Sequence, residues 1–241
     1  MLPLRSLQIG NAMTDHTLQE AFDESGLSTF SVRIRDKFRP QAKRLFDICV
    51  SLALILLIFP AAFLIFIAIM VSGEIPFYSH VRVGQGGREF GCLKFRSMRR
   101  DADVVLSKLL RDDPAAKLEW EATRKLRNDP RVTRMGSFLR ATSLDELPQL
   151  LNVVAGQMSL VGPRPVTRDE LTAFYEPCQA AAYCSVKPGL TGLWQISGRS
   201  ELGYHKRSAL DTLYVERMSL RADLVILFRT IGVVVRRQGA W

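Results

Sequence analysis

Cysteine and histidine are scarce in this sequence, and neither is grouped. The 241 residues include four cysteines and three histidines. No two cysteines form a C-x-x-C pair, and the histidines at positions 16, 80 and 205 lie far apart, so the sequence offers no zinc-site spacing. We predict reduced thiols in a cytosolic environment rather than a disulfide framework.

Acidic residues are also in short supply. Asp and Glu number 24 against 33 Lys and Arg, which gives a formal net charge of +9. This balance predicts an anionic partner: a nucleic acid, an anionic membrane or a phosphorylated substrate. The basic stretches do not alternate with aromatic residues as in RNA-binding motifs, and no zinc finger or heptad repeat follows them. We therefore expect no nucleic-acid partner and favour a membrane or a phosphorylated substrate.

Charge is missing altogether from Ile48 to Gly73, a run of 26 residues. As a helix this run would be roughly 39 Å long, against about 30 Å for the hydrocarbon core of a bilayer. A buried core helix is a weaker explanation at this length, so we predict that the run lies in lipid. Residues 1–40 form a polar tail without an apolar signal region, and we expect it to be disordered.

Pro60 interrupts the middle of the apolar run and should kink or break a helix there. Both flanks are basic: residues 33–44 hold six basic residues and one acid, and residues 74–100 hold six basic residues and two acids. Positive flanks mark the cytoplasmic side of a membrane segment. We therefore predict a re-entrant helix–break–helix over residues 41–73, with both flanks in the cytoplasm.

The remaining chain, residues 74–241, is predicted to form a cytosolic, membrane-associated domain of the α+β class that is mostly helical. A Gly-rich turn between apolar segments predicts a β-hairpin over residues 77–95. Two helices are expected within residues 101–127, a turn at 128–131 and a helix from about Glu146 to Val154, ended by Gly156. Residues 221–241 are apolar but interrupted by Arg229, which predicts an amphipathic helix at the lipid surface.

Adjacent acids stand out in "ATSLDELPQLL", residues 141–151. Pro148 fits the first turn of a helix, which puts Asp145 near the N-cap. One interpretation is structural: Asp145 caps the helix and Glu146 favours its positive end. The other is chemical, because the acids could hold Mg²⁺ or attack phosphorus while neighbouring arginines hold phosphate oxygens. A helix N-terminus would also lower the pKa of Asp145. The nearby arginines are Arg131, Arg134, Arg140 and Arg164.

From Lys43 to the C-terminus, the chain resembles the bacterial sugar transferase family, the monotopic phosphoglycosyl transferases that prime surface-glycan synthesis. The resemblance is carried, in order, by "KRLFD", "KFRSM", "DPRVTRMGSFLR", "TSLDELPQLLNVVAGQMSLVGPRPV", "KPGLTGLWQISGRS" and "LRADLVILFRTI". The joint occurrence of LDELPQ and SLVGPRP is very specific. The length is that of the short form of the family, and the chain is most similar to its exopolysaccharide-priming branch.

The resemblance implies that a UDP-sugar, of galactose or glucose type, gives its sugar-1-phosphate to undecaprenyl phosphate and releases UMP. Asp145 matches the family's nucleophile, which forms an aspartyl-phosphosugar intermediate, and Glu146 matches the residue that binds Mg²⁺. Arg140 and Arg164 match phosphate-holding arginines, and Lys94 and Arg96 of "KFRSM" are near-site candidates. The implied location is the cytoplasmic face of the bacterial inner membrane, with its lipid as a further partner. A homo-oligomer remains open.

Some residues keep two interpretations. Lys187 could contact the nucleotide or simply be solvated, and Trp194 could stack on uracil, although packing is the better explanation. Ser97 stands where the family often has Thr. A non-enzymatic, membrane-anchored adaptor with a basic face is the alternative function, but it leaves the acid pair and the rigid Gly/Pro loops unexplained.

Overall fold

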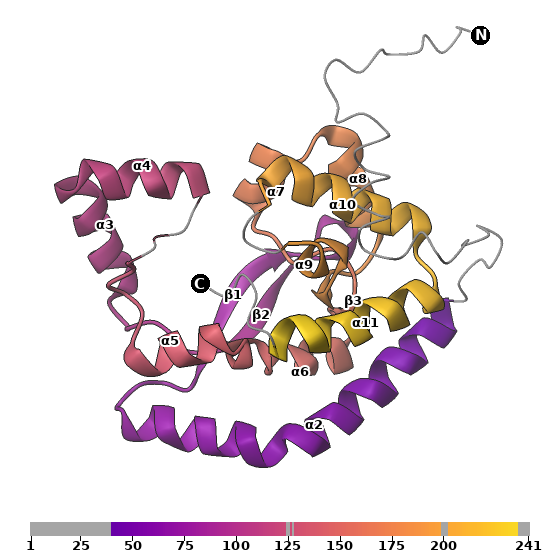
Figure 1. Cartoon of the computed structure of the whole chain (residues 1–241), viewed down its shortest axis with the longest axis horizontal. Helices are drawn as coiled ribbons and strands as arrows, with labels where there is room; N and C mark the ends of the chain where they lie inside the picture. Colours follow the sequence, from indigo (N-terminus) through magenta and orange to yellow (C-terminus); the bar gives the residue numbers. More distant parts are fainter. Residues whose placement is uncertain (1–39, 124–125, 127, 199–201, 236–241) are drawn as a thin grey trace, which may run out of the picture.

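The computed structural model describes residues 40–123, 126, 128–198 and 202–235. The predicted tail, most of the basic segment before it meets the apolar run, and residues 236–241 lie outside these ranges. The described chain is mostly helical with two small two-stranded sheets, which confirms the predicted class (Figure 1).

The apolar run forms one helix, α2 (Pro40–Val71), with Pro60 inside it. Among the described helices, only α2 is long and apolar enough to cross a membrane by length and composition. Of the two outcomes predicted at Pro60, a break is absent, because the helix continues through the proline, and the helix instead bends along its course (Figure 1). A single proline removes one backbone hydrogen bond, and the strongly apolar turns on either side maintain the helix around it.

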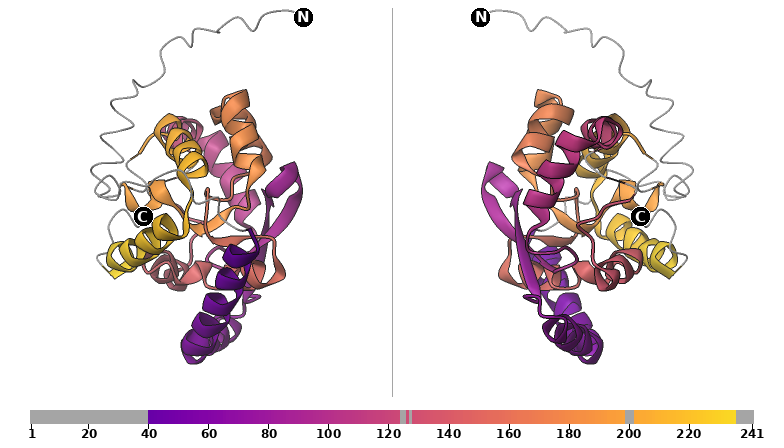
Figure 2. Two further views of the ribbon diagram at one scale, coloured as in Figure 1. Left: turned by 90° about the vertical axis from the view of Figure 1, so that its right-hand side faces the viewer. Right: turned by 90° about the vertical axis from the view of Figure 1, so that its left-hand side faces the viewer.

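Both halves of α2 pack against the rest of the protein. The first half contributes Phe46, Val50 and Leu54 to the main apolar core. The second half buries Ile65 and Ile69 in a separate cluster. Figure 2 shows α2 along one edge of the molecule in both views. The opposite side of the helix is a row of exposed apolar side chains: Leu52, Leu56, Leu57, Phe59, Phe63, Leu64, Ile67, Met70 and Val71.

A cluster of buried charges fixes the start of α2. Lys43 forms an ion pair with Asp223, and its Nζ lies 3.8 Å from Asp47 Oδ1. The Tyr214 hydroxyl donates to Asp223 Oδ1 at 2.7 Å. Asp47 in turn accepts a bond from the Leu160 amide at 3.3 Å. We call Lys43, Asp47, Tyr214 and Asp223 the anchor cluster, because it ties α2 to the C-terminal helices.

The predicted hairpin is confirmed. Strands β1 (Phe77–Val83) and β2 (Glu89–Phe95) pair antiparallel, with Tyr78 opposite Lys94. The short 3₁₀ turn η1 (Gln85–Gly87) joins them, and φ is 71° at Gly86 and 73° at Gly87, which the glycines permit without a Cβ clash. The hairpin is followed by the two predicted helices, α3 (Ala102–Asp112) and α4 (Pro114–Thr123), and by the predicted turn at 128–131.

The second half of the chain consists of short elements. Strands β3 (Ser159–Val161) and β4 (Gly189–Thr191) form a parallel pair. The helices are α5 (Arg134–Ala141), η2 (Leu144–Glu146), α6 (Gln149–Ala155), α7 (Arg168–Phe174), α8 (Pro177–Ser185), α9 (Leu193–Ile196), α10 (Tyr204–Arg217) and α11 (Leu220–Val235). The predicted C-terminal helix is therefore present as α11, with Phe228 and Ile231 exposed. Around the buried Leu150, Leu160, Leu210 and Ile226, α6, β3, α10 and α11 share one core.

Candidate active site

A cleft of about 520 Å³ opens between the end of β2, the α5–η2 segment and helices α9 and α10. It is lined by six of the seven predicted site residues: Lys94, Arg96, Arg140, Asp145, Glu146 and Arg164. Lys187 does not, and the structure places it elsewhere.

The acid pair lies in the 3₁₀ turn η2 rather than at the start of an α-helix. Ser143, just before this turn, has φ 58°, a left-handed conformation that is unusual for a residue with a side chain. Pro148 is itself the N-cap of α6, without a side-chain cap. The prediction that Asp145 caps this helix is therefore wrong, and so is the predicted start at Glu146. The left-handed residue and the proline allow a tight turn that directs both carboxylates into the cleft.

Glu146 is held by two cations. Its Oε1 accepts a bond from Lys94 Nζ at 2.7 Å and from Arg164 Nη2 at 3.3 Å. Burial alone would raise the pKa of Glu146, but Lys94 and Arg164 outweigh it and lower the pKa to about 2. Glu146 is thus an ionised carboxylate at any physiological pH.

Asp145 has a different environment, although it is the next residue in the chain. It is only 7% exposed, and no described residue donates a hydrogen bond to its carboxylate. The nearest cation, Lys94 Nζ, lies 3.8 Å from Oδ2. Burial raises the pKa of Asp145, and the charge of Glu146 adds to this effect while Lys94 opposes it. The predicted lowering of this pKa by a helix N-terminus is therefore wrong, because desolvation dominates and η2 is a single turn.

Backbone contacts between glycines position Arg164. It follows Gly162–Pro163, and a Cβ on Gly162 would lie 2.6 Å from the carbonyl oxygen of Lys187 and 2.8 Å from the amide nitrogen of Gly189. The Gly189 amide donates to Pro163 O at 2.7 Å. Because the two loops touch through their backbones, neither glycine can take a side chain without moving the arginine.

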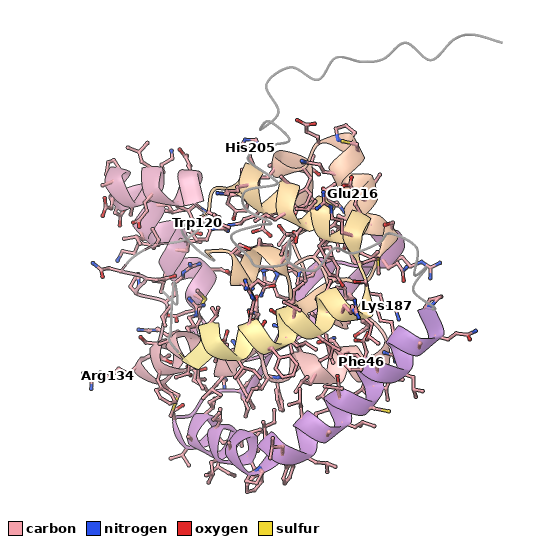
Figure 3. The ribbon with its side chains drawn as sticks, turned by 45° about the vertical axis from the view of Figure 1, so that its right-hand side comes forward. Phe46, Trp120, Arg134, Lys187, His205 and Glu216 are labelled. Carbon is pink, nitrogen blue, oxygen red and sulfur yellow. The ribbon has the colours of Figure 1, made fainter. Side chains whose placement is uncertain are left out.

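The other arginines divide into those that face the cleft and those that do not. Arg140 Nε donates to Ser97 Oγ at 2.9 Å, which fixes the guanidinium beside the acid pair. Arg96 also lines the cleft, but its Nε donates to Ile75 O and its guanidinium lies over the Tyr78 ring. Arg131 lines the cleft too, but it is paired with Asp129. Arg134 is exposed and points away from the body of the protein (Figure 3).

The side chain of Lys187 lies near the start of α2. A Cβ on Gly156 would lie 3.7 Å from Lys187 Nζ and 3.3 Å from Arg44 Nη2. Figure 3 shows Lys187 beside Phe46 at this end of the helix. Burial and the charge of Arg44 lower the pKa of Lys187, and Asp47 partly opposes them. Lys187 lies in a motif that contributes other residues to the cleft, but its own side chain is directed to the anchor cluster.

The cleft is also lined by residues that the prediction of site residues missed, among them Gln195, Tyr204, Arg207 and Tyr175. The Arg207 guanidinium lies over Trp194, with 4.8 Å between Cζ and the ring centroid. Trp194 itself is buried, which supports the packing interpretation of this residue. No motif surrounds Arg207 in the sequence; only its spacing of three residues from Tyr204 on one helix face could have drawn attention to it.

The donor set suits a metal ion only in combination with a phosphorylated ligand. Within the described ranges, no three His, Cys, Asp or Glu side chains are grouped as metal ligands. Mg²⁺ is commonly bound by one or two carboxylates, with substrate phosphates and water completing its shell. Asp145 and Glu146 fit this arrangement, because both ion pairs of Glu146 use Oε1 and leave Oε2 for a cation.

Comparison with known proteins assigns the class to which this fold and cleft belong. The family model described as "Bacterial sugar transferase" matches residues 38–237, so the chain belongs to the bacterial sugar transferase family. It is 51% identical to the exopolysaccharide production protein ExoY of Rhizobium meliloti, over 83% of this chain and 88% of that protein.

Two longer relatives are named for their substrates. The UDP-galactose-lipid carrier transferase of Erwinia amylovora is 51% identical over 83% of this chain but 41% of its own length. The undecaprenyl-phosphate galactose phosphotransferase of Salmonella typhimurium is 47% identical over 83% of this chain and 41% of its own length. The chain thus spans less than half of these two proteins.

Proposed function

We propose that the protein transfers a sugar-1-phosphate from a UDP-sugar to undecaprenyl phosphate, releasing UMP, and so primes exopolysaccharide synthesis. The names of the relatives support this reaction, and galactose and glucose are the favoured sugars because relatives are named for each. The cleft supports the proposal as well, because its acid pair and the cations around it suit phosphoryl transfer.

The observation that carries the proposal is the contrast within the acid pair. Asp145 is buried, has a raised pKa and accepts no hydrogen bond from the described residues, whereas its neighbour Glu146 is fixed and ionised. A desolvated carboxylate without donors is a stronger nucleophile than a solvated one. Asp145 is therefore our candidate for the attacking group.

The reaction then proceeds in two displacements at one phosphorus atom. An oxygen of Asp145 bonds to the β-phosphorus of the UDP-sugar, and the bond from that phosphorus to the bridging oxygen breaks, so that UMP leaves with the electron pair. A phosphate oxygen of undecaprenyl phosphate next attacks the same phosphorus and displaces Asp145 as a free carboxylate. The product is undecaprenyl diphosphate sugar.

Cationic side chains hold the phosphate oxygens during both steps. Lys94, Arg140 and Arg164 surround the acid pair and would balance charge that develops on the phosphoryl group. Glu146 would hold Mg²⁺ through its free Oε2, and the ion would neutralise the diphosphate when bound. Arg96 is in reach of the cleft but is engaged by backbone and ring contacts, so we assign it a supporting position.

We further propose that α2 is re-entrant and that the cleft faces the cytoplasm at the inner membrane, where a soluble nucleotide sugar and a lipid phosphate can meet. Both halves of α2 pack against the same globular body, whereas the two ends of a straight span would lie on opposite sides of a bilayer. The exposed apolar row of α2 supplies the lipid-facing surface.

The direct test of the activity is release of UMP by detergent-solubilised full-length protein. We expect release from UDP-galactose or UDP-glucose that depends on both Mg²⁺ and added undecaprenyl phosphate. A panel of UDP-sugars assayed in the same way would identify the donor. The adaptor alternative predicts no release under any of these conditions, and that result would remove the proposed reaction.

The topology has its own test. Gln41→Cys and Gln85→Cys would be made singly in a background without native cysteines, and labelled with a reagent that cannot cross the membrane. Both sites should be protected in intact cells and labelled after permeabilisation. Labelling of only the first site in intact cells would show a spanning helix.

A further inference from the structure

A second part of the cleft lies beside the acid pair and takes no part in the steps above. We call it the α9–α10 wall: Trp194 and Gln195 of α9, and Tyr204 and Arg207 of α10, all of which line the cleft. Arg164 connects the two parts. Its Nη2 lies 3.3 Å from Glu146 Oε1, and its Cζ lies 5.8 Å from the centroid of the Trp194 ring. The wall therefore begins one side chain away from the acid pair.

The buried polar atoms of this wall that have no hydrogen-bond partner among the described residues include Trp194 Nε1 and Gln195 Oε1. Trp194 is only 6% exposed. A buried donor or acceptor that stays unpaired costs free energy, so such atoms in a cleft indicate a ligand that pairs them. One atom is a donor and the other an acceptor. Between them they can pair with a carbonyl oxygen and an N–H group of a ligand.

The wall is also positively charged. The guanidinium of Arg207 lies 4.8 Å from the Trp194 ring centroid and 4.9 Å from that of Tyr204. Arg164 and Arg207 thus lie against the same indole ring, and Glu170, which accepts a bond from the Tyr204 hydroxyl at 3.3 Å, lines the same cleft. Two guanidiniums on one ring are suited to hold the oxygens of a doubly charged phosphate. Because the indole packs against guanidinium and is almost fully buried, a base cannot stack on it as one sequence interpretation suggested. The unused binding capacity of the indole is the hydrogen bond that its Nε1 can donate.

We propose that the α9–α10 wall binds the leaving nucleoside monophosphate. Arg207 holds its phosphate, and Trp194 Nε1 and Gln195 Oε1 pair with a carbonyl and the adjacent N–H of the uracil edge. This inference rests on the proposed function. The transferred and leaving phosphates of a UDP-sugar share one oxygen, so they must occupy neighbouring positions, and Arg164 lies between the acid pair and the wall. As the bridging bond breaks, the charge that develops on the leaving phosphate is stabilised by a guanidinium.

The test compares Arg207→Gln with Lys206→Gln in the full-length, detergent-solubilised protein. Lys206 precedes Arg207 on α10 and does not line the cleft. Loss of a charged hydrogen bond should raise the inhibition constant of UMP and the KM of the UDP-sugar together, by roughly 10- to 100-fold, and leave the KM of undecaprenyl phosphate unchanged. Trp194→Phe, which removes the N–H and keeps a ring, should raise the same two constants by about 2- to 10-fold. The lysine variant should behave as wild type.

Arg207 also packs on two rings, so the midpoint of thermal unfolding is measured for each variant, with and without UMP. Arg207→Lys keeps the charge and serves as the second variant if Arg207→Gln does not fold. An Arg207 variant that folds and keeps the UMP inhibition constant of wild type overturns the inference. So does a change confined to the lipid acceptor. If the wild type turns over and these variants are normal, only the inference fails; if the wild type neither turns over nor binds UMP, the proposed function fails with it.

Discussion

The protein contains two clusters of buried charge that are similar in composition and opposite in environment. The anchor cluster and the acid pair with Lys94 each combine two carboxylates and one lysine. In the anchor cluster, Asp223 is bonded by Lys43 and Tyr214, and Asp47 by a backbone amide. In the cleft, Glu146 is bonded, but Asp145 accepts nothing from the described residues.

The difference separates a structural use of buried charge from a chemical one. A buried carboxylate that accepts hydrogen bonds from the protein is held in place, and it fixes the elements that supply its donors. The anchor cluster thereby joins two motifs far apart in the sequence, "KRLFD" and "LRADL". A buried carboxylate left without donors is destabilised, and it can gain from bonding to an electrophile or a cation.

The largest expected effects come from replacing one aspartate of each cluster, Asp145 or Asp223, by asparagine. Asp145→Asn should reduce UMP release by at least about 10³-fold, because the nucleophile is lost, and leave the midpoint of thermal unfolding equal or higher. Asp223→Asn should do the reverse. It removes the carboxylate charge that pairs with Lys43, which should cost about 3 kcal/mol of unfolding free energy, while the folded fraction keeps its turnover.

Measuring both turnover and the unfolding midpoint for each variant tests the two roles separately. Substantial activity in Asp145→Asn would mean that Asp145 is not the nucleophile. A normal unfolding midpoint in Asp223→Asn would mean that the anchor cluster does not hold α2 in place.

A smaller effect is expected inside the acid pair. Glu146→Gln should raise the Mg²⁺ concentration for half-maximal rate by about 10- to 100-fold or more, a range seen even for groups that only support metal ligands. It should also move the acid limb of the pH–rate profile to lower pH. Asp145 must be ionised to attack, so activity falls as pH drops through its raised pKa, and removing the negative charge of Glu146 lowers that pKa.

The pH–rate profile of the first displacement, measured at saturating Mg²⁺, checks this result. Asp103→Asn on the exposed helix α3 is a suitable control, because it removes a carboxylate at the rim of the same cleft. An acid limb that stays in place in Glu146→Gln would show that the two carboxylates do not interact.

Local patterns in the sequence were enough to predict the hairpin and the two helices after it. The helix over Glu146–Val154 was misplaced because Pro148 fits equally well as an N-cap or one residue inside the helix, and the left-handed Ser143 has no sequence signature. The parallel pair β3–β4 could not be predicted, since strands of three residues are too short to show a period. Pro60 indicated a break because sequence alone does not reveal how well the adjoining turns are packed.

The site was predictable where it is carried by contiguous motifs and unpredictable where it depends on packing. Asp145, Glu146, Arg140 and Arg164 lie in motifs, and the structure brings them into one cleft. Lys187 lies in a motif too, but the backbone contact between Gly162 and Gly189 sends its side chain toward Arg44. The α9–α10 wall brings together residues of separate helices, and its unpaired atoms can be recognised only in three dimensions.

The smallest expected effect concerns a support of the cleft rather than the acid pair itself. Ser97 Oγ accepts the bond from Arg140 Nε at 2.9 Å, and α5 is held close by Gly136, whose Cβ would otherwise lie 1.9 Å from Ser97 O. Ser97→Ala removes the hydroxyl without affecting that backbone contact. It should lower kcat by about 3- to 10-fold, the value of one hydrogen bond.

Ser97→Thr keeps the hydroxyl, so it should retain the wild-type rate and show that the loss in Ser97→Ala is due to the missing bond. Ser107→Ala, whose hydroxyl donates to Asp103 O on the exposed helix α3, removes a hydroxyl that does not touch an arginine and should leave kcat unchanged. A wild-type rate in Ser97→Ala would mean that Arg140 is positioned by α5 alone. In that case the cleft would resemble the anchor cluster more closely than proposed, with its geometry set by packing.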